Sequence, residues 1–183
     1  MSLPKDFLDK MQTLLKEEYE AFINSYEQEK SLGLRVNTLK TTLDQFETLN
    51  KFDLKSIPWV PEGYFYQQAD RPGKHPYHEA GVYYIQEPSA MSVGTFVEAV
   101  PGEKVLDLCA APGGKSTHVA SQLQQEGLLI TNEIYPQRAK ILSQNIERMG
   151  IKNAVVVNES PQKLAKHFPS YFDRIVVDAP CSG

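Results

Sequence analysis

The sequence predicts an α/β fold, in which a small α+β region precedes a parallel sheet. After Pro101-Gly102, short apolar segments alternate with amphipathic helical segments, which is the pattern of βαβ units. Residues 57–81 are instead rich in Pro, Gly and aromatic residues, which is typical of short strands and loops. Hydrophobic residues make up 41% and charged residues 23% of the chain, so a disordered or fibrous protein is excluded.

The first half is expected to contain one long amphipathic helix and several short elements. Apolar residues recur at spacings of three and four over residues 4–28, with Pro4 suited to the first turn. Strands are expected over residues 34–39 and 82–85, short helices over 42–50 (capped by Thr41 or Thr42) and 89–100 (beginning at Pro88), and a loop over 71–76. Several tyrosines and Phe65 between residues 64 and 84 are expected to form a small core.

The second half predicts four strands, each joined to the next by a helix. The strands are expected at residues 105–108, 128–131, 154–157 and 174–178, and the helices at 116–125, 136–149 and 161–167. We therefore expect an accessory domain over residues 1–86 and a sheet domain over 87–183. Because no helix follows the fourth strand to cover it, the sheet is interpreted as truncated, and the chain as part of a longer protein.

Charge and cysteine content exclude several classes of protein. The 183 residues carry a formal charge of −4, which excludes a dominant basic arm for nucleic acid or membranes. The two cysteines, Cys109 and Cys181, give no disulfide scaffold and favour a reducing, cytoplasmic setting. We find no signal peptide and no apolar run of about 20 residues. His75 and His78 have metal-like spacing without a third ligand, so no metal site is expected.

The turn after the first strand of the sheet is the candidate ligand site. Ligands of open α/β sheets bind at the carboxyl ends of the strands. Gly113 and Gly114 let the backbone approach a ligand, and Asp107 and Glu133 end the first and second strands. Glu133 lies 20 residues after Gly113, which suits hydrogen bonds to ribose hydroxyls. This unit predicts an adenosine-containing cofactor.

Several interpretations of this turn remain open. Gly114-Lys115-Ser116 fits the end of a phosphate-binding loop, but the leading glycine of that motif would fall on Cys109. The glycine fingerprint of nicotinamide cofactors is absent. A turn for S-adenosylmethionine fits better, because this cofactor has no phosphates, and a tight turn that only packs a helix is the remaining alternative.

Two motifs carry a resemblance to a known family. Residues 105–117 (Val-Leu-Asp-Leu-Cys-Ala-Ala-Pro-Gly-Gly-Lys-Ser-Thr) resemble the cofactor motif of the RNA (cytosine-5) methyltransferases, and residues 178–183 (Asp-Ala-Pro-Cys-Ser-Gly) resemble their proline–cysteine motif. Residues 35–40 and 86–91 resemble upstream segments of the same family. The resemblance covers nearly the whole chain and is greatest to the bacterial RsmF-type ribosomal RNA enzymes.

The resemblance implies methyl transfer from S-adenosylmethionine to carbon 5 of a cytosine in small-subunit ribosomal RNA, and the implied partner is either the ribosomal RNA or a ribosomal subunit. It implies a Rossmann-like methyltransferase sheet, with residues 1–86 on the RNA side. The implied cofactor-binding residues are Cys109, Ala110, Ala111, Pro112, Gly113, Gly114, Lys115, Glu133, Ser160 and Asp178. Asp178 and Lys115 would lie between cofactor and cytosine, and Cys181 would assist product release.

The sequence departs from the family pattern at two places. The attacking cysteine of the family lies in a later motif that these residues lack, so the chain alone is expected to be inactive. Cys181 as the attacking nucleophile is an alternative, since the matching thiol attacks in DNA cytosine methyltransferases. At the third strand, where the family places an Asp toward adenine, Ser160 stands here. A non-catalytic RNA-binding scaffold and a nucleotide-binding loop protein are the alternative functions.

Overall fold

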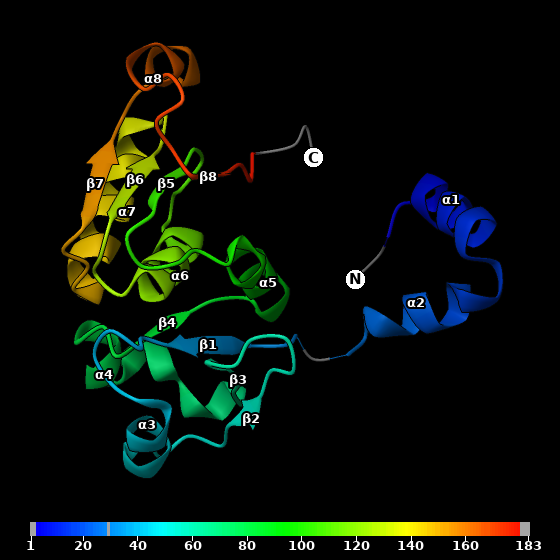
Figure 1. The fold of residues 1–183 in the computed structure, drawn as a ribbon. Coiled ribbons are helices and arrows are strands. Elements are labelled where there is room, and N and C mark those ends of the chain that lie inside the picture. Colours follow the sequence, from blue (N-terminus) through cyan, green and yellow to red (C-terminus); the bar gives the residue numbers. More distant parts are fainter. Residues whose placement is uncertain (1–2, 29, 180–183) are drawn as a thin grey trace. The chain divides into compact units, whose positions relative to one another are not determined.

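The computed structural model describes residues 3–28 and 30–179 of the 183-residue chain. Residues 1–31 and residues 32–183 form two compact units, and each is described by itself. Figure 1 labels the helices and strands.

The first unit contains two helices instead of the single predicted helix, so that prediction was wrong. Helix α1 (Lys5–Leu15) leads into a short 3-10 helix, η1 (Lys16–Glu18), and then into α2 (Tyr19–Ser25). Helix α1 ends before Lys16, whose φ of 47° lies outside the helical range. One continuous helix would hold Phe7 and Phe22 about 22 Å apart, whereas their ring centroids lie 6.2 Å apart. The two helices thus bring two aromatic residues of the apolar stripe together, although no residue of α1 or α2 is fully buried.

The second unit begins with an antiparallel sheet of four short strands in the order β2-β3-β1-β4 (Figure 1). The strands are β1 (Gly33–Val36), β2 (Lys55–Ser56), β3 (Gly63–Phe65) and β4 (Tyr83–Ile85). Helix α3 (Leu43–Leu49) begins at the predicted cap, where the Thr42 hydroxyl accepts a hydrogen bond from the Gln45 amide. Leu34, Val36, Phe46, Tyr64 and Tyr83 form the core, which confirms a core role for tyrosines of this region.

The loop predicted over residues 71–76 is more regular than expected. The structure has 3-10 helices η2 (Gln68–Asp70) and η3 (Pro72–Lys74), followed by a one-turn helix α4 (Pro76–Glu79). Pro72 and Pro76 each occupy the first position of a helix, where proline loses no hydrogen bond and its fixed φ suits the turn. Proline therefore starts helices here, and the prediction of an irregular loop was wrong.

The predicted parallel sheet is confirmed, with strand order β7-β6-β5-β8. Its strands are β5 (Lys104–Asp107), β6 (Leu128–Asn132), β7 (Ala154–Val157) and β8 (Arg174–Val176). The accompanying helices are α5 (Pro88–Val97), α6 (Gly114–Leu123), α7 (Pro136–Met149) and α8 (Pro161–His167). The predicted domain boundary at residue 86 falls between β4 and α5. It stays a prediction, because residues 32–183 pack as one unit.

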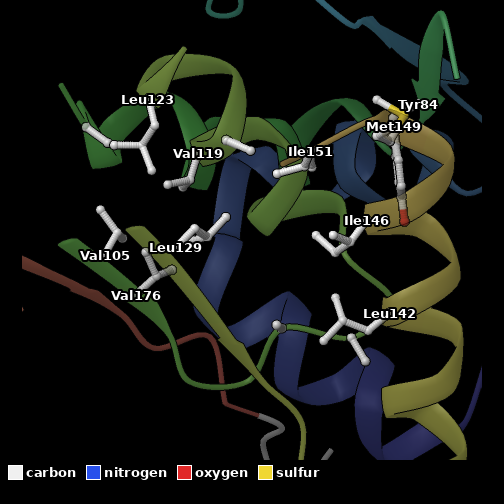
Figure 2. Close-up of a cluster of buried hydrophobic side chains, with 14 residues drawn as sticks. Tyr84, Val105, Val119, Leu123, Leu129, Leu142, Ile146, Met149, Ile151 and Val176 are labelled. Atoms are coloured by element: carbon white, nitrogen blue, oxygen red, sulfur yellow. The ribbon is translucent and has the colours of Figure 1, made fainter. Parts of the chain in front are cut away.

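Alternate residues of the strands supply two cores, one on each face of the parallel sheet. Val105, Leu129 and Val176 pack with residues of α6 and α7 in the larger core, which Figure 2 shows. Leu106 and Ile130 point to the opposite face and pack with Leu164 of α8. Because successive side chains of a strand alternate between faces, both faces of β5 and β6 are covered. This burial fixes the positions of β5 and β6 relative to each other, and therefore the positions of their carboxyl ends.

Two buried side chains of β1 and its flank connect the small sheet to helices α6 and α7 of the parallel sheet. Arg35 Nη2 donates to the Gly114 carbonyl at 3.1 Å and to Thr117 Oγ1 at 2.8 Å, at the start of α6. Asn37 Nδ2 donates to the Gly81 carbonyl at 2.8 Å and to the Met149 carbonyl at 2.9 Å. Burial lowers the pKa of Arg35 to about 10, so its guanidinium remains charged at neutral pH.

A third buried contact joins α6 to the loop before β3. His118 Nε2 lies 2.7 Å from Glu62 Oε1. Burial and the positive charge of Arg35 lower the pKa of His118, so the neutral ring donates its Nε2 proton to the carboxylate. Helix α5 packs against the same ring through Gly94, where a Cβ would lie 2.2 Å from His118 Nδ1. The absence of a side chain at Gly94 sets the distance between α5 and α6.

We expect Gly94→Ala to reduce the free energy of unfolding by about 1–3 kcal/mol, the usual cost of overpacking a core. Alanine favours helices more than glycine does, so the steric clash with His118 is the source of the loss. Gly73→Ala is the matched control, because its Cβ would lie 3.5 Å from Ile85 Cδ1, an ordinary contact. Urea unfolding measures both variants, and equal stabilities would contradict the described packing of α5 on α6.

We also expect the stability of the chain to fall between pH 7.5 and 5.5, with His118 contributing to the slope. A folded-state pKa below the unfolded value means that the unfolded chain binds the proton first, so acidification favours unfolding. His118→Gln should flatten this slope, whereas His167→Gln, at an exposed position of α8, should leave it unchanged. Urea midpoints at each pH provide the measurement, and an unaltered slope in His118→Gln would refute the prediction.

Candidate cofactor and active site

The candidate site lies at the carboxyl ends of β5, β6 and β8. The strand order reverses at β5, because β6 lies on one side of it and β8 on the other, and ligands of open α/β sheets bind at such a point. A pocket of about 360 Å³ lies there, within the size range of small-molecule sites. It is lined by Leu108, Cys109, Ala111, Lys115, Asn132, Glu133, Ile134, Tyr135, Arg138, Pro161, Asp178 and Ala179.

The predicted cofactor turn is held against helix α7 by hydrogen bonds to its carbonyl groups. Arg138 Nη2 donates to the Ala111 carbonyl at 2.8 Å, and Asn145 Nδ2 donates to the Pro112 carbonyl at 2.8 Å. Gly113 has a φ of 116°, a conformation that L side chains rarely adopt, and forms the N-cap of α6. The turn is therefore a fixed wall of the pocket and requires glycine at this position.

Glu133, the acid predicted to hold a ribose, lines the pocket immediately after β6. Its side chain is only 4% exposed. Its Oε1 accepts a hydrogen bond from the Tyr135 amide at 3.0 Å, and its Oε2 lies 3.3 Å from Arg138 Nη1. A carboxylate has about four acceptor positions, so two remain for a ligand.

Asn132 organises the strand ends, a role that the sequence analysis did not assign. Its Nδ2 donates to the Leu108 carbonyl at 3.0 Å, and its Oδ1 accepts from the Glu159 amide at 3.0 Å. One buried amide at the end of β6 thus joins the segments that follow β5 and β7. A polar residue at the end of an otherwise apolar strand was the available signal in the sequence.

Lys115 and Asp178, the predicted pair between cofactor and substrate, are brought together. Lys115 Nζ lies 2.5 Å from Asp178 Oδ2, and both residues line the pocket. Asp107 lies at the end of β5, where its Oδ2 accepts a 2.7 Å hydrogen bond from Ser116 Oγ. Its Oδ1 is buried without a partner among the described residues, and burial raises the pKa of this carboxyl group.

Cys109 lines the pocket as part of the turn, but its environment does not activate the thiol. Burial raises the pKa of Cys109, and the neighbouring carboxylates of Asp107, Glu133 and Asp178 raise it further. Because the thiolate is the reactive form, Cys109 is a poor nucleophile at neutral pH. Cys181, the other predicted cysteine, lies outside the described residues.

Several predicted cofactor residues shape the site without lining the pocket. Ala110 is buried and donates its amide to the Asn132 carbonyl at 2.8 Å, while Pro112, Gly113 and Gly114 form the turn. The Ser160 hydroxyl accepts a hydrogen bond from the Lys163 amide as the N-cap of α8, and the next residue, Pro161, lines the pocket. Ile134 and Tyr135 line it without having been predicted; as exposed apolar residues after a strand, they carried a weak signal.

Over residues 3–28 and 30–179, no group of three or more His, Cys, Asp and Glu residues could hold a metal ion. Within the same ranges, none of the helices is both long and apolar enough to cross a bilayer.

Curated relatives cover the whole of this chain. Ribosomal RNA small subunit methyltransferase F from Pectobacterium atrosepticum is 37% identical over 194 residues, an alignment that spans 100% of this chain and 40% of the relative. The protein of the same name from Vibrio vulnificus is 37% identical over 99% of this chain and 40% of its own length. The chain therefore spans about 40% of the length of these relatives.

Solved structures share the fold. A methyltransferase homolog from Pyrococcus horikoshii is 30% identical, with a TM-score of 0.84 over 100% of this chain and 61% of that chain. NSun6 from the same organism, solved with SFG, has a TM-score of 0.82 over 97% of this chain and 71% of that chain, and its 19% identity shows the fold alone.

Two family descriptions match consecutive parts of the chain. Residues 3–88 match the N-terminal domain of 16S rRNA methyltransferase RsmF, and residues 95–183 match 16S rRNA methyltransferase RsmB/F. Together the two matches leave only short segments unassigned. With the Rossmann-like parallel sheet and the pocket at its switch point, they show that this chain belongs to the RsmF-type family of 16S rRNA methyltransferases.

Proposed function

We propose that this chain supplies the cofactor-binding part of an enzyme that methylates carbon 5 of a cytosine in small-subunit ribosomal RNA, with S-adenosylmethionine as donor. The observation that carries the proposal is the pocket itself. The buried Glu133 carboxylate and the Lys115–Asp178 pair all line it, at the switch point of the sheet. The names of the relatives, ribosomal RNA small subunit methyltransferase F, support the RNA substrate.

The described residues fit an adenosine-containing cofactor. Glu133 retains two acceptor positions, which suit the two hydroxyls of a ribose. Ile134, Tyr135 and Pro161 give the pocket an apolar wall against which a flat base can pack. Cys109, Ala111 and Lys115 of the turn also line the pocket. When bound, S-adenosylmethionine supplies the methyl group, and these residues bind and orient it.

The Lys115–Asp178 pair suits the chemistry of methyl transfer to a cytosine ring. Carbon 5 of cytosine is a poor nucleophile, and addition of a thiolate at carbon 6 makes it reactive. Negative charge then develops at ring nitrogen 3, where the Asp178 carboxyl group stabilises it by sharing a proton with that nitrogen. The 2.5 Å contact with Lys115 holds the Asp178 side chain in place. The target base must be unstacked from its neighbours to reach such a pocket.

In this proposal the two cysteines do not attack the ring. Cys109 is a protonated turn residue, and Cys181 assists release of the methylated product. The attacking thiolate comes from a later motif of the family, outside these 183 residues. The chain alone therefore binds the cofactor without turning over.

We expect calorimetric titration of the folded chain with S-adenosylhomocysteine to show binding that depends on Glu133. Hydrogen bonds to a charged group contribute about 1.5–3 kcal/mol each, so Glu133→Ala should weaken binding at least about 10-fold. Glu147→Ala, at an exposed position of α7, is the matched control and should bind as the wild type does. A folded wild-type chain that does not bind would favour the RNA-binding scaffold instead.

We expect no methyl transfer when this chain alone is incubated with small-subunit ribosomal RNA and S-adenosylmethionine labelled in its methyl group. A polypeptide extended to include the later cysteine motif should transfer label, and Asp178→Asn should slow it about 100-fold or more. Asp53→Asn, an exposed carboxylate in the loop before β2, is the control. Transfer by this chain alone that Cys181→Ala abolishes would instead make Cys181 the attacking nucleophile.

A further inference from the structure

Arg138, in the first turn of α7, contacts both walls of the pocket with one guanidinium group. Its Nη1 lies 3.3 Å from Glu133 Oε2, and its Nη2 donates to the Ala111 carbonyl at 2.8 Å. Glu133 follows β6, and Ala111 lies in the turn after β5, so the two contacts reach separate segments. The planar guanidinium has a fixed spacing between its nitrogens, which sets the distance between the carboxylate and the turn.

The buried Glu133 carboxylate needs the contact with Arg138. A carboxylate that is 4% exposed is costly unless it is paired and hydrogen-bonded. The two carboxylates that line the pocket each have a cation: Asp178 contacts Lys115, and Glu133 contacts Arg138. The Arg138 side chain is itself 47% exposed, so it contributes little to the core of the fold.

The arrangement also fixes which acceptor positions of Glu133 are free. The Tyr135 amide occupies one position on Oε1, and the Arg138 guanidinium forms an ion pair with Oε2 at 3.3 Å. At least one acceptor position therefore remains on each oxygen, which matches the two neighbouring hydroxyls of a ribose. Without Arg138, the carboxylate keeps the contact with the Tyr135 amide but is free to rotate about it.

We propose that Arg138 is a positioning residue, which holds the Glu133 carboxylate and the cofactor turn in the relative arrangement that recognises both ribose hydroxyls of the cofactor. The inference rests on the proposed function, since it assigns the cofactor to this pocket. It goes further by naming the residue that gives the site its preference for ribose over deoxyribose.

The test compares S-adenosylhomocysteine with its 2′,3′-dideoxy analogue in calorimetric titrations of the 183-residue chain. We expect the wild-type chain to bind S-adenosylhomocysteine about 100-fold more tightly than the analogue, since two hydrogen bonds to a carboxylate are lost. Arg138→Ala should weaken binding of S-adenosylhomocysteine about 10-fold and change binding of the analogue by less than about 3-fold. Arg138→Lys keeps the positive charge but lacks the planar pair of guanidinium nitrogens. It should therefore lose part of the discrimination between S-adenosylhomocysteine and the analogue.

Lys140→Ala, an exposed cation two residues further along α7, is the matched control and should retain full discrimination. Circular dichroism and urea unfolding confirm that each variant is folded. Equal weakening of both ligands in Arg138→Ala, or no weakening of either, would overturn the positioning role while leaving the proposed function intact. A folded wild-type chain that does not bind S-adenosylhomocysteine would overturn the proposed function, and this inference with it.

Discussion

A buried guanidinium on the small sheet is the interaction on which the arrangement of the second unit depends. Arg35 is fully buried, and such a charge is tolerated only when it is hydrogen-bonded. Its contacts with the Gly114 carbonyl and the Thr117 hydroxyl fix the beginning of α6 relative to β1. The cofactor turn ends where α6 begins, so the small sheet helps to position the turn as well as to cover the helix.

The pocket is built from contacts that converge on the same edge of the sheet. Parallel strands end together, so residues distant in the sequence meet there without needing a motif of their own. Asn132, at the end of β6, holds the segments after β5 and β7, and Arg138 connects the turn to Glu133. The titratable groups are thus held by side chains from neighbouring segments and not by the strands alone. This restraint lowers the entropy that a ligand must remove on binding.

Sequence reasoning failed where local pattern and tertiary packing disagreed. A spacing of three and four over residues 4–28 predicts one helix, because periodicity carries no information on where a helix folds back. The contact between Phe7 and Phe22 favours the break at Lys16. In residues 71–76, proline was interpreted as a loop former, although it also starts helices. Around the parallel sheet, each helix and strand is favoured both by its own pattern and by the cores, and the predicted order of strands and helices was confirmed.

The sequence by itself determined the α/β class, the four parallel strands, the glycine turn and the acidic residue, Glu133, at the end of the second strand of the parallel sheet. These features depend on neighbouring residues, through periodicity, helix ends and the conformational freedom of Gly113. Only the tertiary structure decided that Arg138 contacts Glu133, that Asn132 joins three segments, and that Ser160 caps α8 beside the pocket. Such contacts join residues from different strands and helices, and their partners are fixed by strand order and core packing, which no local pattern specifies.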